Sequence, residues 1–262
     1  MTPLLAHTDK SFWHGYLDFY AAHLPLDVKG TIVEFGVFKG HSIRWLADRF
    51  PNARIVGADI LPTQPEWPTD QRITYARLDQ DDVAQISGLF ASLQNVELII
   101  EDGSHIPKHQ SACLKLGLPA LAPGGTYVLE DIHTSHPNHA LYANEFGGTQ
   151  AGARAQTSLS VLLAFEHMFS TGAEMTAVRC AKLAEGSHFN AAEIESMFKS
   201  IESIKVYKRA VLPHSCWRCG SSDFDYHAFK CVCGAALMDA ADSMTIVIKK
   251  RQDAASAACT AA

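Results

Sequence analysis

The chain has 262 residues, of which 47% are hydrophobic and 19% are charged, a composition that excludes an intrinsically disordered chain, a collagen-like repeat and a small disulfide-dense protein. Its 22 Lys and Arg residues are outnumbered by 28 Asp and Glu residues, so the formal net charge is −6. No run of five like charges occurs in the sequence, and strong binding to nucleic acid or to an anionic membrane surface is therefore disfavoured.

The beginning of the sequence shows no targeting signal. Residues 1–10 contain neither a basic segment nor an apolar stretch of about seven residues, both of which a secretory signal would require. No apolar run approaches the roughly 18 residues of a membrane span. We therefore expect a cytoplasmic protein that binds no membrane.

Residues 1–29 are predicted to form a helical segment ahead of the first strand. Aromatic residues are concentrated in it, among them Tyr16, Phe19 and Tyr20. Such a pattern is typical of a helix that packs on its own domain or on a second subunit of a homo-oligomer. The alternative is a lid that faces the substrate.

From residue 31 onward, apolar runs alternate with segments of helical periodicity. The predicted strands cover residues 31–37, 53–60, 73–78, 96–100 and 126–129, and the predicted helices cover residues 42–50, 82–93 and 108–121. Strands that alternate with helices of this length form βαβ units. The pattern therefore predicts a mostly parallel sheet with helices on both faces.

The alternation stops at residue 133. Residues 133–152 contain histidines, a proline and a Gly-Gly pair, and a loop of this length beyond a strand end is usually functional or disordered. Further elements are expected as helices at 153–170 and 191–200, strands at 203–212 and 243–250, and a disordered Ala-rich tail at 253–262.

The first strand leads into a turn that contains Gly36 and Gly40, where the backbone could pass close to a ligand. The second strand ends in Asp59, at the place where a carboxylate accepts hydrogen bonds from ribose hydroxyls in nucleotide-binding sheets. The spacing Gly-x-x-x-Gly lacks the third glycine of the dinucleotide fingerprint. A nucleoside without a pyrophosphate therefore fits this turn better than NAD, and an NAD-dependent enzyme is disfavoured.

Acidic residues follow the fourth and fifth strands. Asp102 closes one strand and the pair Glu130-Asp131 closes the other. These strands are neighbours in a doubly wound sheet, so the three carboxylates are expected to converge in one crevice. Like charges packed together are protonated, repelled apart or neutralised by a cation, and hard oxygen ligands suit Mg²⁺ or Mn²⁺. We therefore expect a Mg²⁺ or Mn²⁺ site here, with unrelated surface acids as the alternative.

Three stretches carry a family resemblance: residues 34–42, residues 78–81, and Glu101-Asp102-Gly103-Ser104-His105 with Glu130-Asp131 downstream. Over roughly residues 30–132 the chain resembles the class I S-adenosylmethionine-dependent methyltransferases. Within that superfamily it is most similar to the macrocin O-methyltransferase group, which methylates sugar hydroxyls of macrolides with a divalent metal. Members commonly have Gly-Asp-Gln and Asp-Asp-Gly-Ser-His, where this chain has Leu78 and Glu101 at the first positions.

The resemblance implies a Rossmann-like, doubly wound sheet of seven strands in the order 3-2-1-4-5-7-6, formed by residues 30–252. It also implies an S-adenosylmethionine site. The residues that would surround the methionine part are Glu34, Gly36, Gly40 and Ser42, Asp59 would bind the ribose, and Asp79 and Gln80 would flank the adenine. An Asp before a helix is also an ordinary N-cap, which gives Asp79 a second interpretation.

Histidines follow the acidic residues. His105 is expected to take the proton of the acceptor hydroxyl, because an imidazole that titrates near pH 6.5 accepts a proton at neutral pH. His109 is interpreted as structural support. Residues His133, His136 and His139 lie in the loop and are expected to contact substrate or solvent, and Tyr142 and Phe146 are candidates for stacking on a sugar ring.

Four cysteines fall within one short segment, as Cys216-x₂-Cys219-x₁₁-Cys231-x-Cys233, whereas the other three are isolated. In a reducing compartment such a cluster indicates a metal site more often than disulfides. Two close pairs of thiolates match a tetrahedral structural Zn²⁺ site. We therefore expect a zinc knuckle at residues 214–240, inserted before the last strand.

The predicted function is methyl transfer from S-adenosylmethionine to a hydroxyl of a sugar or glycosylated metabolite, dependent on a divalent metal. Two alternatives remain open at this point. One is a catechol-type O-methyltransferase, which also holds a vicinal diol on Mg²⁺. The other is a nucleic-acid-binding or scaffold protein that uses the zinc knuckle and keeps the sheet as a relic, against which the net charge argues.

Overall fold

The structure is a computed structural model that describes residues 8–12, 14–147, 155–210, 213–216, 218–237 and 242–252. The predicted tail at 253–262, the first seven residues of the predicted N-terminal segment and the end of the predicted loop at 148–152 lie outside the described residues.

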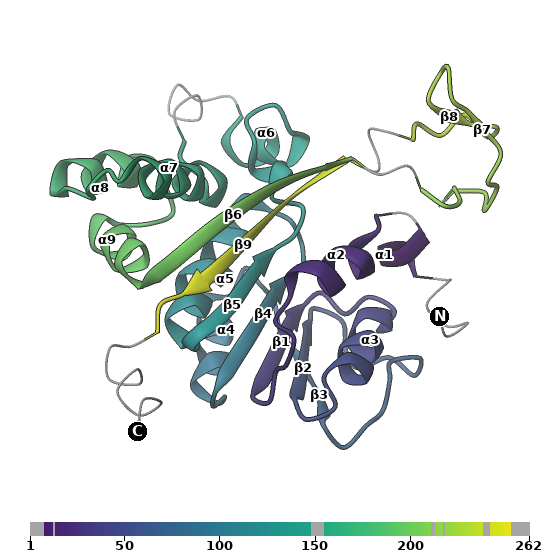
Figure 1. The fold of residues 1–262 in the computed structure, drawn as a ribbon, viewed down its shortest axis with the longest axis horizontal. Coiled ribbons are helices and arrows are strands. Elements are labelled where there is room, and N and C mark those ends of the chain that lie inside the picture. The colour runs from purple at the N-terminus through teal and green to yellow at the C-terminus, as the bar shows by residue number, and fades with distance from the viewer. Residues whose placement is uncertain are drawn as a thin grey trace.

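The centre of the fold is a seven-stranded sheet (Figure 1). Its strands are β1 (Thr31–Phe35), β2 (Arg54–Asp59), β3 (Ile73–Arg77), β4 (Val96–Glu101), β5 (Leu121–Leu129), β6 (Ile201–Ala210) and β9 (Asp242–Lys250). They are ordered β3-β2-β1-β4-β5-β9-β6, and β9 runs antiparallel to both of its neighbours. The predicted order 3-2-1-4-5-7-6 is confirmed, because β9 is the seventh strand of this sheet.

Helices cover both faces of the sheet (Figure 1). The longer helices that follow β1 are α3 (His41–Arg49), α4 (Val83–Ala91), α5 (Pro107–Ala120), α7 (Ser158–Thr171), α8 (Ala177–Ala184) and α9 (Ala191–Ser200). Alternate residues of β1 belong to two separate buried clusters: Val33 packs with α4, α5, α7 and α9, whereas Ile32 packs with α3 and the N-terminal helices. All five residues of β1 are buried, Glu34 among them, because helices cover the strand on both faces.

Two elements differ from the sequence-based expectation in the middle of the chain. Strand β5 begins at Leu121, five residues before the predicted start, because Leu121 already pairs with Val96 of β4. The segment predicted as a loop from residue 133 contains a 3₁₀ turn, η2 (Ile132–Ser135), and a short helix, α6 (Ala140–Phe146). His139 caps α6, because its Nδ1 accepts a hydrogen bond from the Leu141 N–H at 3.2 Å.

The N-terminal segment forms α1 (Asp9–Phe12) and α2 (Tyr16–His23). The α2 helix packs on the face of the sheet that α3 also covers, and the rings of Tyr16 and Tyr20 are buried there. Within the part of the chain that the structure describes, no helix combines the length and the apolar character that crossing a membrane requires.

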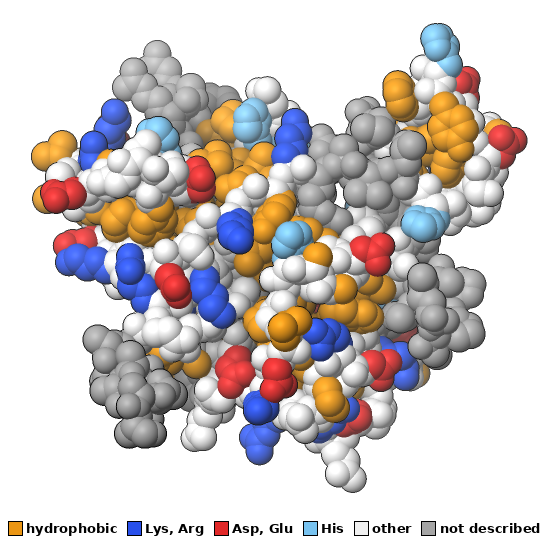
Figure 2. All heavy atoms as spheres, viewed as in Figure 1, with side chains coloured by type: hydrophobic (Ala, Val, Ile, Leu, Met, Phe, Trp, Pro, Cys, Tyr) orange, Lys and Arg blue, Asp and Glu red, His pale blue; other side chains and the backbone are white. Residues whose placement is uncertain are grey.

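The cysteine-rich segment between β6 and β9 projects from the end of these two strands (Figure 1). It contains the two-stranded β7 (Phe224–Asp225) and β8 (Lys230–Cys231), and we call residues 213–237 the knuckle. Figure 2 shows apolar side chains on the knuckle, where Tyr226 and Phe229 are exposed. On the same view, basic and acidic side chains are intermixed over the rest of the molecule.

Candidate active site and cysteine cluster

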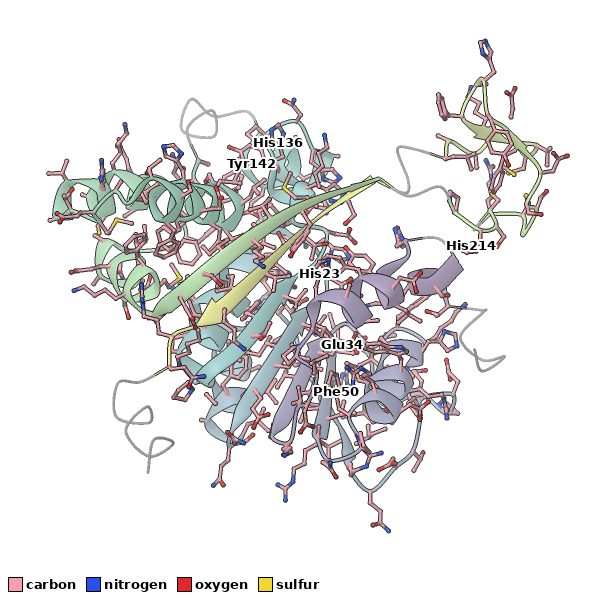
Figure 3. All side chains as sticks on the ribbon, in the orientation of Figure 1. His23, Glu34, Phe50, His136, Tyr142 and His214 are labelled. Atoms are coloured by element: carbon pink, nitrogen blue, oxygen red, sulfur yellow. The ribbon has the colours of Figure 1, made fainter. Side chains whose placement is uncertain are left out.

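A cavity of about 650 Å³ opens at the carboxyl ends of β1, β2, β4 and β5. Most of the residues predicted from the sequence line it: Gly36, Ser42, Asp59, Asp79, Gln80, Asp102, His105, Glu130 and Asp131. Glu34 lies immediately beneath, fully buried under the N-terminal helices (Figure 3), and Gly40 caps the start of α3. The predicted site residues are therefore brought together at one edge of the sheet, where open α/β sheets bind ligands.

The turn after β1 is shaped by Gly36 and held by Asp59. Gly36 has a φ of +87°, and a Cβ at this position would overlap the carbonyl group of Asp102. Asp59 Oδ2 accepts the backbone N–H groups of Val37 at 2.8 Å and Phe38 at 3.2 Å. The carboxylate at the end of β2 therefore anchors the turn that follows β1.

Glu34 connects β1 with α3. Its Oε2 accepts a hydrogen bond from the Ser42 hydroxyl at 3.0 Å, and its Oε1 lies 3.2 Å from Nζ of Lys10. Burial raises the pKa of Glu34 above its ordinary value, although Lys10 and Ser42 lower it. This carboxyl group is thus held by one cation and one hydroxyl inside the protein.

Asp79 and Gln80 follow β3. Asp79 Oδ1 accepts the N–H of Asp81 at 2.9 Å, and the N-cap of α4 is Asp82, so the interpretation of Asp79 as a helix cap is wrong. The Gln80 amide bridges two strand ends. Its Oε1 accepts the Ser104 N–H at 2.8 Å, and its Nε2 donates to Glu101 Oε1 at 2.9 Å.

Three acidic residues follow the neighbouring strands β4 and β5, as the sequence predicted. Glu130 is fully buried, and Asp131 has a φ of +47°. The Asp131 Oδ1 accepts hydrogen bonds from the hydroxyls of Ser243 at 2.6 Å and Tyr16 at 3.3 Å. Burial raises the pKa of Asp131, but the positive charge of His105 and the Ser243 hydroxyl outweigh it, so the net pKa is lowered.

His105 projects its imidazole toward two of these carboxylates. Its Nε2 lies 3.8 Å from Asp102 Oδ1 and 3.9 Å from Asp131 Oδ2. One ligand atom from each of these three residues lies within 4.8 Å of the others. The backbone of His105 has a φ of +57°, and its carbonyl accepts the Thr134 hydroxyl at 2.7 Å.

Lys10 is a site residue that sequence reasoning missed. Its Nζ lies 2.8 Å from Asp102 Oδ2 and 3.1 Å from Glu130 Oε1, besides its contact with Glu34. Burial alone would lower the pKa of Lys10, but Asp102, Glu130 and Glu34 together raise it well above its ordinary value. A single lysine in an aromatic helical segment carries no local signal of such a role. The role of Lys10 can be inferred only from the fact that several buried carboxylates need a counter-charge.

The remaining histidines lie around the site. His109 Nδ1 is 2.7 Å from the Ser104 hydroxyl, and its Nε2 is 3.3 Å from Asp81 Oδ1, which is the supporting arrangement predicted for it. The His133 ring contacts the His139 ring at a centroid distance of 5.5 Å, and His136 is exposed.

The aromatic residues considered for sugar stacking lie on α6. Figure 3 shows Tyr142 beside this helix, and its ring packs on Phe146 at a centroid distance of 4.7 Å. Tyr142 is buried, and its hydroxyl donates to the Ala155 carbonyl at 3.3 Å. Among the described residues, neither of the two lines the cavity. Their contacts are those of a packed helix.

The four cysteines of the knuckle converge. The sulfur atoms of Cys216 and Cys233 are 3.7 Å apart, those of Cys219 and Cys231 are 3.4 Å apart, and all four lie within 4.8 Å of one another. Tetrahedral Zn²⁺ with Zn–S bonds of about 2.3 Å separates its sulfur ligands by about 3.8 Å. Although burial raises the pKa of Cys216, hydrogen bonds from the Arg218 and Cys219 backbone lower it to about 7. The geometry of this cluster fits zinc.

Residues 33–132 match the profile of a family described as "Methyltransferase domain". We call this segment the methyltransferase domain, after the family whose profile it matches. It contains the glycine turn, Asp59 and the acidic residues of β4 and β5, and the resemblance noted in the sequence is confirmed. The match ends at the start of η2, so α6 to α9, the knuckle and the last two strands of the sheet lie beyond it.

Curated relatives of the methyltransferase domain include several O-methyltransferases, two of which are named for a rhamnosyl-bearing substrate. The chain is 31% identical over 138 residues to 8-demethyl-8-alpha-L-rhamnosyl tetracenomycin-C 2'-O-methyltransferase of Streptomyces olivaceus. The aligned segment covers 49% of this chain and 36% of that protein. The chain is also 33% identical over 124 residues to demethylmacrocin O-methyltransferase of Streptomyces fradiae. This alignment covers 47% of this chain and 29% of that protein. The chain thus spans less than half the length of these relatives.

A solved structure shares the fold of the methyltransferase domain and its flanking elements. It is MycE methyltransferase from the mycinamycin biosynthetic pathway, described in complex with Mg, SAH and mycinamycin VI. It superimposes with a TM-score of 0.58 at 20% sequence identity, covering 93% of this chain and 50% of the other.

Proposed function

We propose that this protein transfers a methyl group from S-adenosylmethionine to a hydroxyl group of a sugar or glycosylated small molecule. The observation that carries the proposal is the convergence of Asp102, His105 and Asp131 within 4.8 Å of one another, beside a cavity bounded by the Gly36 turn. The sugar O-methyltransferase names of the relatives support the acceptor class. Products would be a methyl ether and S-adenosylhomocysteine.

The cofactor half of the cavity fits a nucleoside that carries an amino acid. Gly36 lets the turn pass close to the Asp102 carbonyl, and Gly36, Ser42 and Asp59 line the same wall of the cavity. Asp59 would hold the ribose hydroxyls through Oδ1, because this oxygen accepts the Leu61 N–H and has a second lone pair, whereas Oδ2 already accepts the Val37 and Phe38 N–H groups. Asp79 and Gln80 would flank the adenine, and Glu34, Gly36, Gly40 and Ser42 would surround the methionine part.

The acceptor half of the cavity fits a divalent cation. Asp102, Glu130 and Asp131 supply hard oxygen ligands of the kind that Mg²⁺ and Mn²⁺ prefer. Such a cation, when bound, lowers the pKa of hydroxyl groups that chelate it and fixes their position. The residues of the chain would hold the acceptor between this crevice and the cofactor, with its oxygen in line with the S–CH₃ bond.

His105 would accept the proton of the acceptor hydroxyl. As the new O–CH₃ bond forms and the S–CH₃ bond breaks, that proton passes to the imidazole. The carboxylates of Asp102 and Asp131 both lie within 4 Å of its Nε2. General base catalysis of this kind is typically worth about 10²–10⁴ in rate.

The cysteine cluster would hold one structural Zn²⁺. Catalytic zinc keeps one coordination position open, and four thiolates leave none. Among the described residues of the knuckle, the buried apolar cluster contains Cys216, Cys231, Ala235 and Leu237, so its own core is small and a metal would contribute much of its stability. Reduced thiols of this kind fit a cytoplasmic location.

The test is an assay of purified protein with S-adenosylmethionine, Mg²⁺ and a panel of acceptors. We expect methyl transfer to glycosides with free vicinal hydroxyls, loss of activity with EDTA, and recovery with Mg²⁺ or Mn²⁺. Asp131→Asn should lower activity at least tenfold, whereas Asp48→Asn on the exposed face of α3 should not. Transfer to catechols or RNA alone, or full activity in metal-free protein, would overturn the proposal.

A further inference from the structure

Lys10 reaches the acidic crevice from outside the methyltransferase domain. It belongs to α1, which precedes the sheet, yet its ammonium contacts the residues that end β1, β4 and β5: Glu34 at 3.2 Å, Asp102 at 2.8 Å and Glu130 at 3.1 Å. A fourth oxygen, the Tyr20 hydroxyl, lies 3.0 Å away. An ammonium has three donors, so these oxygens satisfy it completely.

The N-terminal segment contacts every carboxylate proposed to hold the cation. Lys10 binds one oxygen of Asp102 and one of Glu130, and Tyr16 of α2 donates to Asp131 Oδ1 at 3.3 Å. Thr8, Lys10, His14 and Tyr16 also line the cavity. The segment therefore both neutralises the crevice and covers part of it.

Asp102 is divided between two sets of partners. Its Oδ2 faces Lys10, and its Oδ1 faces His105 and the cluster that includes Asp131. A cation that uses Asp102 and Glu130 would thus share both ligands with the ammonium of Lys10. Two positive charges that share carboxylates lie only a few ångströms apart and repel strongly, because the crevice is shielded from water.

We propose that Lys10 and the divalent cation bind the acidic crevice in competition, so that entry of the cation releases α1 and α2 from the site. The inference rests on the cation site of the proposed function. In the cation-free protein, Lys10 keeps the carboxylates together and the N-terminal segment in place. Because linkage is reciprocal, whatever holds the segment in place weakens cation binding, and cation binding loosens the segment.

The first measurement is the affinity for Mn²⁺ alone, by electron paramagnetic resonance of free Mn²⁺. Lys10→Met removes the competing charge and keeps the length of the side chain, so we expect it to bind Mn²⁺ at least tenfold more tightly than wild type. Lys10→Arg keeps the charge and should stay close to wild type. The matched control is Lys29→Met, which removes an equal charge from an exposed position and should change the affinity less than twofold.

The second measurement follows the segment itself and needs no variant. Amide hydrogen exchange over residues 8–23 should rise several-fold when Mg²⁺ is added to wild-type protein. In Lys10→Met it should be fast already and respond little to Mg²⁺. Exchange in α9, which lies on the other face of the sheet, should not respond in either protein.

The outcomes separate this inference from the proposed function. Equal or weaker Mn²⁺ binding by Lys10→Met, with wild-type exchange unaffected by Mg²⁺, would overturn the competition and leave the cation site intact. Absence of Mn²⁺ binding in both proteins would remove the cation site, and the competition with it. Weak binding by wild type, tight binding by Lys10→Met and faster exchange with Mg²⁺ would together establish the competition.

Discussion

Asp59 Oδ2 accepts the backbone N–H of Val37 at 2.8 Å, so the acid that ends β2 holds the turn that follows β1. Its other oxygen accepts the Leu61 N–H at 2.9 Å. These contacts orient the carboxylate toward the cavity before any ligand binds. A side chain positioned in this way loses little further entropy on binding, which favours tight recognition of a ribose.

Asp59→Asn should weaken the binding of S-adenosylhomocysteine at least tenfold. The amide replaces a charged acceptor, and a hydrogen bond to a charged group is worth roughly 1.5–3 kcal/mol. Isothermal titration calorimetry measures the effect, and thermal melting shows whether the turn itself has loosened. Unchanged affinity in a variant that melts like wild type would remove Asp59 from the cofactor site. Asp48→Asn again serves as the exposed control.

His105→Gln should lower kcat by about 10²–10⁴ and leave the affinity for S-adenosylhomocysteine nearly unchanged. Its imidazole is also close enough to Asp102 and Asp131 to act as a metal ligand. Mn²⁺ affinity distinguishes the two roles, because loss of a base leaves it unchanged and loss of a ligand weakens it. The exposed His167→Gln on α7 controls for the substitution. A kcat within threefold of wild type would exclude His105 as the base.

The core of the fold could be predicted because its signals are local. Strand β1 is buried throughout, and its apolar run is visible in the sequence. Helix α9 begins and ends at the predicted residues, since Asn190 and Glu193 form a reciprocal capping box at its start. The convergence of the acidic residues followed from topology, because parallel neighbouring strands end at the same edge.

Other features depend on contacts that no local pattern reports. Lys10 meets Glu130 across 120 positions of sequence, and nothing around Lys10 distinguishes it from a solvated lysine. Helix α8 was not predicted, and Cys180 is its one buried residue, so little of it belongs to the core. Strand β5 starts among Pro123 and two glycines, where pairing with β4 overrides the turn propensity of the sequence.

Glu101→Gln should stabilise the protein at neutral pH. Burial raises the pKa of Glu101 above the ordinary 4.5, against the opposing effects of His105 and Gln80. The unfolded chain therefore loses this proton at lower pH than the folded protein does. As pH rises above 4.5, wild type loses stability relative to the variant until the folded-state pKa is passed, and the difference then stays constant.

Urea unfolding between pH 4 and pH 8 measures this difference in the free energy of unfolding. Gln at position 101 can still accept the hydrogen bond from Gln80 Nε2, so the bridge between the strand ends is kept. Glu202→Gln, an exposed position on β6, should show no such pH dependence. A variant that is less stable than wild type at pH 8 would mean that ionised Glu101 makes a favourable contact.

Cys231→Ser should release zinc and unfold the knuckle while the sheet remains. Wild type should contain about one zinc per chain, and the variant much less, because one thiolate of a tetrahedral set is lost. The pairing of β6 with β9 runs from Ile201 opposite Lys250 to Ala210 opposite Asp242. This ladder should therefore hold both ends of the knuckle in place. Hydrogen exchange should therefore rise over residues 213–237 and not in β9, and affinity for S-adenosylhomocysteine should stay within twofold of wild type. Ser222→Ala, exposed in the same segment, should retain zinc. Loss of cofactor binding together with zinc would show instead that the cluster supports the methyltransferase domain directly.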